Sequence, residues 1–308
     1  MRVFYSEKHR LRDASTELHG GLLVKPFEGP FRAEWILEAV KEAGFTDVHA
    51  PAEHGLKTAL KVHDAGYLDF LATCWERWQA AGFQGEAIAT SFPCRRSQIA
   101  RVPNHIDGAL GYYANSAETA ISGGTYEAAV ASMDVALSGG DWLNAGNRFA
   151  FSLCRPPGHH AGIDLFGGYC FINNAAVAAQ RLLDLGARKV AILDVDFHHG
   201  NGTQDITYRR DDIFFASLHG EPANAFPYFL GYADETGEGA GEGLNANYPL
   251  PSGTPFDVWS AALADALTRI TAYGAEVIVV SLGVDTFEQD PISFFKLKTP
   301  DYIRMGEM

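Results

Sequence analysis

Two long segments of the chain change from a helical to a strand-like spacing of hydrophobic residues. In 175–196 and in 258–285, apolar residues first recur with the period of a helix. After a Gly-Ala turn at Gly186 or Gly274, a run rich in β-branched residues follows. The same helical period predicts two further helices, over 31–44 and 65–82. A helix followed by an apolar strand is typical of βαβ units, so we expect an α/β fold with a parallel sheet.

Two other segments lack this periodicity. Residues 83–111 are rich in Gly, Pro and Ser and contain Arg95, Arg96 and Arg101, and residues 231–255 are rich in glycine. The first segment is longer than a simple connection needs, which favours a functional loop or an interface, with a flexible excursion as the alternative. We find no linker or repeat, so the 308 residues predict one large α/β domain or two small ones.

The composition is that of a globular, acidic chain. Hydrophobic residues make up 47% of it, and 38 Asp and Glu against 24 Lys and Arg give a net charge of −14. Such a charge repels nucleic acid and attracts small cations, so a basic ligand is favoured. Neither a signal peptide nor an uncharged stretch long enough to span a membrane is evident, which predicts a cytoplasmic protein. Scattered cysteines without C-x-x-C spacing favour buried thiols: Cys74, Cys94, Cys154 and Cys170.

Charged side chains gather where the first apolar strand ends. VAILDVDFHHGNG (190–202) passes from an apolar run to Asp194, Asp196, His198 and His199. Strand side chains alternate, so Asp194, Asp196 and His198 should project to one side. Burying unpaired carboxylates is costly unless a cation or a hydrogen-bond network offsets it. We therefore predict a bound cation here, with a hydrogen-bonded polar cluster as the alternative.

The second apolar strand delivers another carboxylate. EVIVVSLGVD (276–285) ends at Asp285, and sites in open parallel sheets lie beyond the carboxyl ends of strands. Asp196, His198 and Asp285 would balance the charge of a divalent cation and leave positions open for water and substrate. Asp194 lies deeper in the row and better suits the orientation of neighbours or the binding of a monovalent cation.

A third segment presents two adjacent histidines. In CRPPGHHAGIDLFGGYCFINN (154–174), a Pro-Pro-Gly turn precedes His159 and His160, and on a turn both rings can reach one site. Two imidazoles near a metal-bound water can act as base and acid; the alternative is that one of them is structural. Gly168 and Tyr169 should bring backbone and an aromatic ring close to the same place.

The motifs CRPPGHH, GGYCFINN, LDVDFHHGNG and SLGVD resemble those of the zinc-dependent histone deacetylase family, and within it the bacterial acetylpolyamine amidohydrolases. KVHDAGYLDFL (61–71) matches as well, and the resemblance runs from Arg2 to the end. It implies a single three-layer α/β/α domain over 1–308, around a mainly parallel eight-stranded sheet of the arginase and deacetylase type. It also implies hydrolysis of the acetyl amide of acetylated polyamines, or alternatively of acetyl-lysine in proteins.

The resemblance also implies roles for individual residues. Asp196, His198 and Asp285 would hold one zinc ion, and His159 and His160 would form the acid–base pair. Asp194 would orient His159 and, with the backbone around Ser217 and Leu218, hold a structural potassium ion. Asn201 would be the partner of His160. The substrate tunnel would be lined by Gly168, Tyr169 and Phe226. Asp107 and Glu118 would form its acidic mouth, with the alternative that either acid is a solvated surface residue. The 83–111 segment would form a homodimer.

Two positions separate this chain from arginase, which shares the fold and needs further carboxylates for a second metal. Gly200 and Gly283 stand at those positions, so one metal ion is expected. The chain's end, KLKTPDYIRMGEM (296–308), begins a helix with a proline in its first turn. In the family a strand and a Gly-Gly-Tyr turn follow, so we expect a shortened form that binds zinc but is weakly active and unstable.

Overall fold

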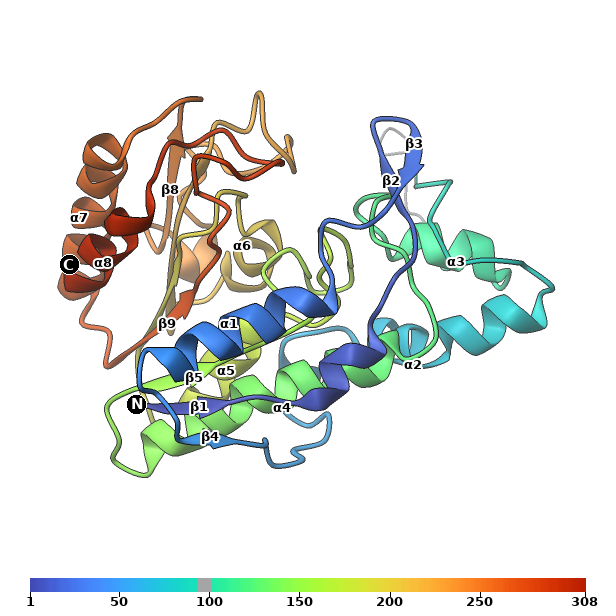
Figure 1. Ribbon diagram of the computed structural model, residues 1–308, viewed down its shortest axis with the longest axis horizontal. Coiled ribbons are helices and arrows are strands. Elements are labelled where there is room, and N and C mark those ends of the chain that lie inside the picture. The colour runs from blue at the N-terminus through green and yellow to red at the C-terminus, as the bar shows by residue number, and fades with distance from the viewer. Residues whose placement is uncertain (94–100) are drawn as a thin grey trace. The chain divides into compact units, whose positions relative to one another are not determined.

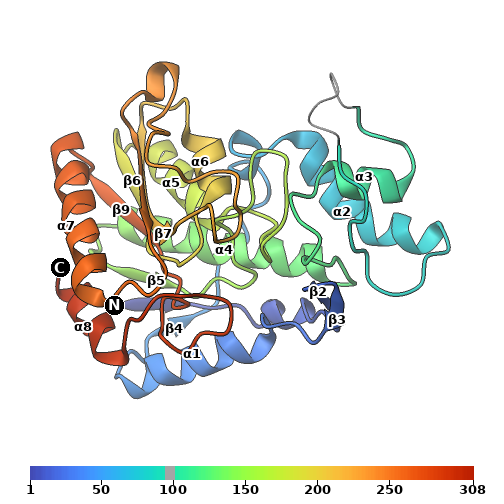
Figure 2. The ribbon, with the colours of Figure 1, turned by 90° about the horizontal axis from the view of Figure 1, so that it is seen from above.

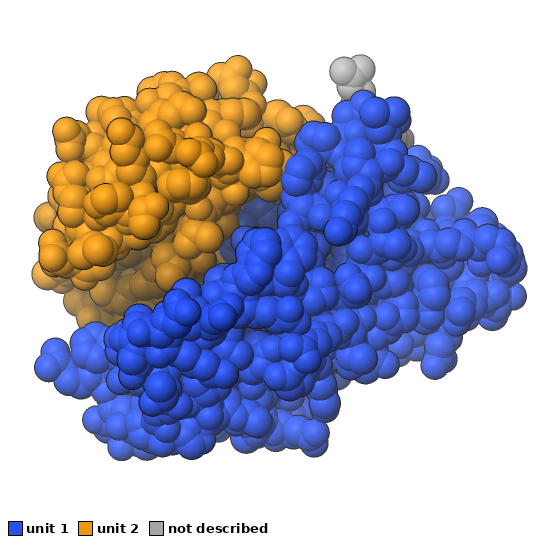
Figure 3. Space-filling model, in the orientation of Figure 1, with its two compact units in different colours: residues 1–181 blue, residues 182–308 orange. Residues whose placement is uncertain are grey.

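A computed structural model describes residues 1–93 and 101–308 (Figure 1). The chain divides into two compact units, Met1–Arg181 and Leu182–Met308, coloured separately in Figure 3. Both units contain parallel strands and helices, as the hydrophobic pattern predicts. Cys94, Arg95 and Arg96 lie outside the described residues.

Unit 1 contains a three-stranded parallel sheet with a helix on each face. Its order is β4-β1-β5, and its strands are β1 Arg2–Phe4, β4 Val48–His49 and β5 Ala150–Ser152. Side chains alternate along β5, so Phe151 packs with helix α1 while Ser152 meets helix α4. Helix α4 can approach because it carries glycine there: a Cβ on Gly139 would lie 2.4 Å from Ser152 Oγ.

The other elements of unit 1 are an antiparallel hairpin, formed by β2 and β3, and helices. They are η1 Glu7–Leu11, β2 Glu17–His19, β3 Leu22–Val24, α1 Pro30–Glu42, η2 Ala59–Lys61, α2 Ala65–Ala80, α3 Ile106–Tyr112 and α4 Thr125–Asn144. Helix α5 (Asn174–Asp184) begins in unit 1 and ends in unit 2. Helices α1 and α2 confirm the predictions for 31–44 and 65–82.

Unit 2 is built on a four-stranded parallel sheet in the order β8-β7-β6-β9. Its elements are β6 Val190–Asp194, α6 Asn201–Thr207, β7 Ile213–Gly220, η3 Gly239–Gly241, β8 Asn245–Leu250, α7 Phe256–Tyr273, β9 Val277–Ser281 and α8 Thr299–Glu307. Figures 1 and 2 show α6 and α7 on opposite sides of the sheet. Trp259 and Leu263 of α7 pack on Phe214 and Leu218 of β7. Strands β6 and β7 are buried throughout, as expected for central parallel strands.

Two segments without a regular hydrophobic period contain regular structure, and one helix was not predicted. The segment 231–255 is not all loop, because it contains η3 and β8, and β8 lies at a sheet edge, where its Pro249 is tolerated. The segment 83–111 ends in helix α3, whose glycines weaken the helical pattern. Helix α4 was not predicted, because it is rich in Ala, Ser and Gly and is buried around most of its surface.

Strand β9 confirms the strand expected in 276–285 but lies at the other edge of the sheet. Among the described strands it pairs with β6 alone. Its apolar side chains are therefore less buried than the sequence suggests: Ile278 is 43% exposed and Val280 49%. Cys74 and Cys170 are buried and Cys154 is partly buried, as expected for packed thiols. None of the described helices is both long and apolar enough to span a lipid bilayer.

The KVHDAGYLDFL motif holds the segment that follows the tandem histidines. His63 Nε2 accepts from the backbone N–H of Asn173 at 3.0 Å, which leaves its Nδ1–H to donate to Gly162 O at 2.7 Å. The Tyr67 hydroxyl donates to Phe171 O at 2.6 Å. Both side chains are buried. Burial lowers the pKa of His63 to about 4, and the protonated ring could no longer accept from Asn173.

We predict that His63 makes the protein less stable as the pH falls. The unfolded histidine takes up a proton near pH 6.5, whereas folded His63 does so only near pH 4. The free energy of unfolding should therefore be at its full value above pH 6.5 and decline between pH 6.5 and 4, by up to about 3 kcal/mol for this residue. Urea unfolding across this range measures the slope.

His63→Gln should remove close to one proton from that pH dependence, whatever its effect on stability at pH 7. His19→Gln, at an exposed histidine of the same unit, is the control and should leave the slope unchanged. Equal slopes for the wild-type protein and His63→Gln would contradict the assignment.

Candidate metal centre

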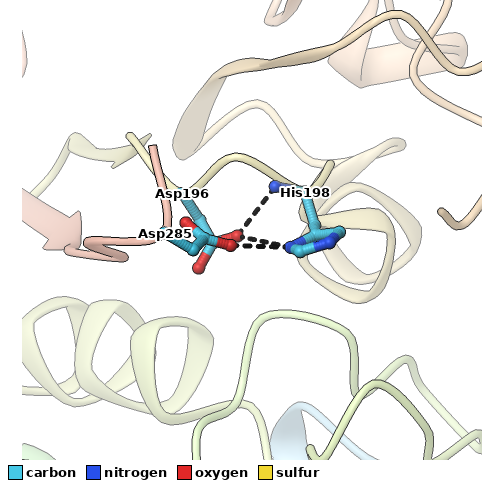
Figure 4. Close-up of side chains that lie close together, drawn as sticks. All are labelled: Asp196, His198 and Asp285. Carbon is cyan, nitrogen blue, oxygen red and sulfur yellow. Dashed lines mark hydrogen bonds and ion pairs between the residues drawn. The ribbon is translucent and has the colours of Figure 1, made fainter. Parts of the chain in front are cut away.

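Asp196, His198 and Asp285 come together in unit 2, as Figure 4 shows. Each offers one donor atom, and these atoms lie within 4.8 Å of one another. The alternation argument placed Asp196 and His198 on the strand itself. Strand β6 instead ends at Asp194, and the two residues occupy the bends that follow. Asp285 likewise lies beyond the end of β9.

Backbone hydrogen bonds to carboxylates shape these bends. Asp194 Oδ1 accepts from the N–H of Asp196 at 3.2 Å, and Asp196 Oδ1 accepts from the N–H of His198 at 2.8 Å. Asp285 Oδ1 accepts from the N–H of Phe197 at 2.8 Å. Such local bonds are typical of aspartate in turns, and they fix the side chains that bear the donor atoms. Phe197, between the two donors, points into the core and is 1% exposed.

The electrostatics of the cluster favour a cation. His198 Nδ1 lies 2.7 Å from Asp285 Oδ2 and 3.2 Å from Asp196 Oδ1. Burial alone lowers the pKa of His198, but hydrogen bonds and charge from the two aspartates outweigh it and raise the pKa to about 10. Burial, reinforced by the nearby charge of Asp196, raises the pKa of Asp285 above its usual range. Two carboxylates and an imidazole are suitable zinc donors, and a divalent ion would supply the positive charge otherwise carried by a proton.

Two glycines limit the site to these donors. A Cβ on Gly283 would lie 2.0 Å from Asp196 Oδ2, and a Cβ on Gly200 would lie 2.2 Å from Asp194 Oδ2. No side chain fits at either position without movement of the aspartates. The carboxylates that a second metal would need at these positions are absent from the sequence, and they would fit there only if the aspartates moved.

The residues predicted for a potassium ion also lie in unit 2. Asp194 is fully buried and pairs in parallel register with Ser217 of β7, and Leu218 follows on the same strand. Asn201 begins helix α6. Asp194 is predicted to orient His159, and Asn201 to be the partner of His160. Because these pairs combine residues of unit 2 with residues of unit 1, both roles stay predictions.

The tandem histidines lie in unit 1. His159 and His160 are 8% and 3% exposed, and their ring centroids are 4.0 Å apart. Gly168 lies directly against the second ring: a Cβ there would come 2.1 Å from His160 Cδ2. Its φ of +53° also favours glycine. The sequence prediction that the Gly-Gly-Tyr stretch approaches the histidines thus holds for Gly168 and His160.

Glutamates hold the turn that carries Tyr169. The Tyr169 hydroxyl donates to Glu17 Oε1 at 2.9 Å, and its N–H donates to Thr119 Oγ1 at 2.8 Å. Glu118 Oε1 accepts from the N–H of Gly168 at 2.9 Å and from Thr119 Oγ1 at 3.2 Å. Burial, followed by the charge of Glu17, raises the pKa of Tyr169 well above its usual range. Glu118, predicted at an acidic mouth, therefore also fixes this turn.

The remaining predicted residues are placed separately. Phe226, in unit 2, lies with its ring centroid 6.2 Å from that of His198. Asp107 lies in the first turn of α3 in unit 1 and is partly buried. Sequence reasoning did not find Glu17 and Thr119, because their contacts with Tyr169 span 152 and 50 residues and leave no local pattern.

The chain is similar to known proteins along almost its full length. A model of the histone deacetylase domain matches residues 26–308. An acetylpolyamine amidohydrolase from Mycoplana ramosa is 73% identical over 306 residues, which cover 99% of this chain and 89% of that protein. Acetylpolyamine amidohydrolase 1 from Pseudomonas aeruginosa is 55% identical over 308 residues, which cover 100% of this chain and 89% of that protein.

Solved structures agree. The crystal structure of an acetylpolyamine aminohydrolase from Burkholderia pseudomallei superposes with a TM-score of 0.93 at 33% identity, covering 99% of this chain and 88% of that one. The fold is therefore that of the arginase and deacetylase type, which confirms the expected fold class.

We predict one divalent metal ion per purified chain. Asp285→Ala should weaken metal retention by more than about 100-fold, because it removes one of two balancing charges and one of three donors. Asp211→Ala, at an exposed aspartate of unit 2, is the matched control and should retain the metal. Elemental analysis after dialysis measures both; two ions per chain in the unmutated protein would contradict the prediction.

Proposed function

This chain belongs to the histone deacetylase domain family, and from that premise we propose that it hydrolyses the acetyl amide of acetylated polyamines. Acetate and the free amine would be the products. The observation that carries the proposal is the identity of more than half of all residues with two acetylpolyamine amidohydrolases, over nearly the whole chain. A cytoplasmic location and the lack of a nucleic-acid partner remain expectations from the acidic composition.

Zinc is the cofactor that we propose, held by Asp196, His198 and Asp285. When bound, it supplies a Lewis acid that polarises the amide carbonyl and acidifies a water molecule. The chain's contribution is to orient His198, since Asp285 accepts from the Phe197 amide while its other oxygen faces the imidazole. Gly283 keeps the space beside Asp196 free of side chains. A potassium ion near Asp194 and the Ser217 and Leu218 backbone is part of the same proposal.

The acid–base roles in this proposal fall to His159 and His160. Hydrolysis requires that a proton leave the attacking water and that a proton reach the departing amine nitrogen. The ring centroids are 4.0 Å apart, and two positive charges at that distance would repel each other, which suits a pair that divides the acid and base roles. One ring can then accept a proton while the other supplies one.

The substrate chain would be lined by Gly168, Tyr169 and Phe226. In unit 1, Gly168 and Tyr169 are held in place by hydrogen bonds to Glu17, Glu118 and Thr119. A cationic amine is favoured by the net charge of −14, to which Asp107 and Glu118 contribute. The field acts through all the acids together, so Glu118 can contribute its charge while it accepts hydrogen bonds.

We predict a preference for small cationic acetyl-amines. For zinc-loaded protein, kcat/KM for acetylputrescine should exceed that for an uncharged acetamide of equal chain length by about tenfold at low salt, and the ratio should shrink as salt screens the field. Equal turnover of the two compounds would contradict the electrostatic part. An acetyl-lysine peptide completes the panel: if it is preferred, the protein is an acetyl-lysine deacetylase instead. Absence of any turnover would favour a weakly active zinc-binding homologue.

We also propose that the chain forms a homodimer through the 83–111 segment, in which the structure describes 83–93 and 101–111. Val102 is 47% exposed and Phe92 44%, an apolar character that suits an interface. Mass measurement in solution over a range of concentrations should give twice the chain mass of 33.4 kDa. A monomer at all concentrations would contradict this proposal.

A further inference from the structure

We propose that Glu235 is a positioning residue, which holds the loop 226–235 of unit 2 against the segment that bears the metal ligands. The loop follows β7, and its first residue, Phe226, has its ring 6.2 Å from that of His198. The inference rests on the proposed function only in giving Phe226 a role toward substrate. The placement of the loop itself stands on contacts within unit 2.

The Glu235 carboxylate accepts hydrogen bonds from three different parts of unit 2. Its Oε2 accepts from Gln204 Nε2 of helix α6 at 2.6 Å and from the backbone N–H of Gly231 at 2.8 Å. Asn247 Nδ2 of strand β8 lies 3.3 Å from the same oxygen. A single partly buried acceptor therefore joins the loop, a helix and a strand. Loss of that acceptor would leave Gln204 Nε2 and the Gly231 N–H unsatisfied in an environment with little water.

Further bonds fix the loop backbone around the same point. Gly231 O lies 2.8 Å from His219 Nε2, and Tyr232 O accepts from Asn247 Nδ2 at 3.1 Å. Gly231 has a φ of +106°, and a Cβ there would lie 2.8 Å from His199 Cγ and from His219 Nε2. The loop backbone thus packs directly on two imidazole rings. Its position depends on the polar residues beneath it.

The same network reaches the segment that bears the metal ligands. Gln204 Oε1 lies 3.1 Å from His199 Nε2 and accepts from the amides of Asn245 and Asn247 at 3.0 and 2.9 Å. Gln204, Asn245 and His199 are at most 3% exposed. Because His199 follows the ligand His198 directly, one hydrogen-bonded chain runs from the metal-ligand segment through Gln204 to Glu235 and the loop. The side-chain amides of Gln204, Asn245 and Asn247 all donate within this network, and these bonds together favour one arrangement of the loop.

Hydrogen exchange and kinetics of Glu235→Ala test this role in the zinc-loaded full chain. Amides in 226–235 should exchange about tenfold faster or more, while those of β6 and β7 stay protected. The metal content should remain that of the unmutated protein. For acetylputrescine, KM should rise about fivefold or more with kcat changed by less than about twofold, because the wall moves while the ligands do not.

Two further variants separate positioning from a general structural role. Glu235→Gln keeps a carbonyl oxygen that can accept from Gly231 and should restore most of the protection and of the KM. Glu242→Ala removes the same charge from the same region, where Glu242 is exposed and accepts from Thr236 Oγ1 alone among the described contacts of its side chain. It should behave like the unmutated protein. Combined with Phe226→Ala, Glu235→Ala should raise KM less than additively, because both act on one wall.

Unchanged exchange in 226–235, or exchange that rises equally across unit 2, would overturn the proposal. Additive effects of Glu235→Ala and Phe226→Ala would overturn the link to Phe226. The proposed function fails separately: if the unmutated protein turns over no acetyl-amine, the exchange result still decides whether Glu235 holds the loop.

Discussion

The parallel pairing of β6 with β9 is the constraint on which the candidate metal centre depends. Their register aligns Asp194 with Ser281, so both strands finish at the same edge of the sheet. Beyond that edge Asp285 reaches across to the backbone N–H of Phe197 and thereby ties the two strand ends together. Carboxylates that are costly to bury are placed side by side because the sheet brings their strands together. A cation at this position would offset the cost and add stability to the fold.

Close packing around the candidate metal ligands is made possible by glycine at a few positions. Gly283 lets Asp196 lie against the chain that leads to Asp285, and Gly231 lets the loop backbone lie on His199 and His219. The two cases differ in kind. At Gly283 only space matters, whereas at Gly231 both the positive φ and the space require glycine. Larger residues would move a ligand in the first case and the loop in the second.

Periodicity and motif spacing predict much of the framework but not its long-range contacts. Helices α1, α2 and α7 and strands β6 and β9 follow from local apolar patterns, and the three donors follow from polar residues after such strands. Helix α4 was not predicted from the sequence, because it is buried on most sides and therefore lacks the polar face of an amphipathic helix. The hydrogen bonds between Glu17 and Tyr169 and between Glu235 and Gln204 join residues far apart in the sequence. Glutamate and glutamine are usually exposed, so their residue types do not predict these bonds. Nothing local in the sequence marks them.

The acidic residues of this chain have two separable effects. Their sum sets a long-range field, which the count of 38 Asp and Glu already predicts. Individually, several serve as acceptors for backbone amides: Glu118 for Gly168, Glu235 for Gly231, and Glu86 for Ser15 and Thr16. Replacing such a residue changes a turn as well as a charge. A loss of activity on neutralisation is therefore no evidence of contact with a cationic substrate unless charged and uncharged substrates respond differently.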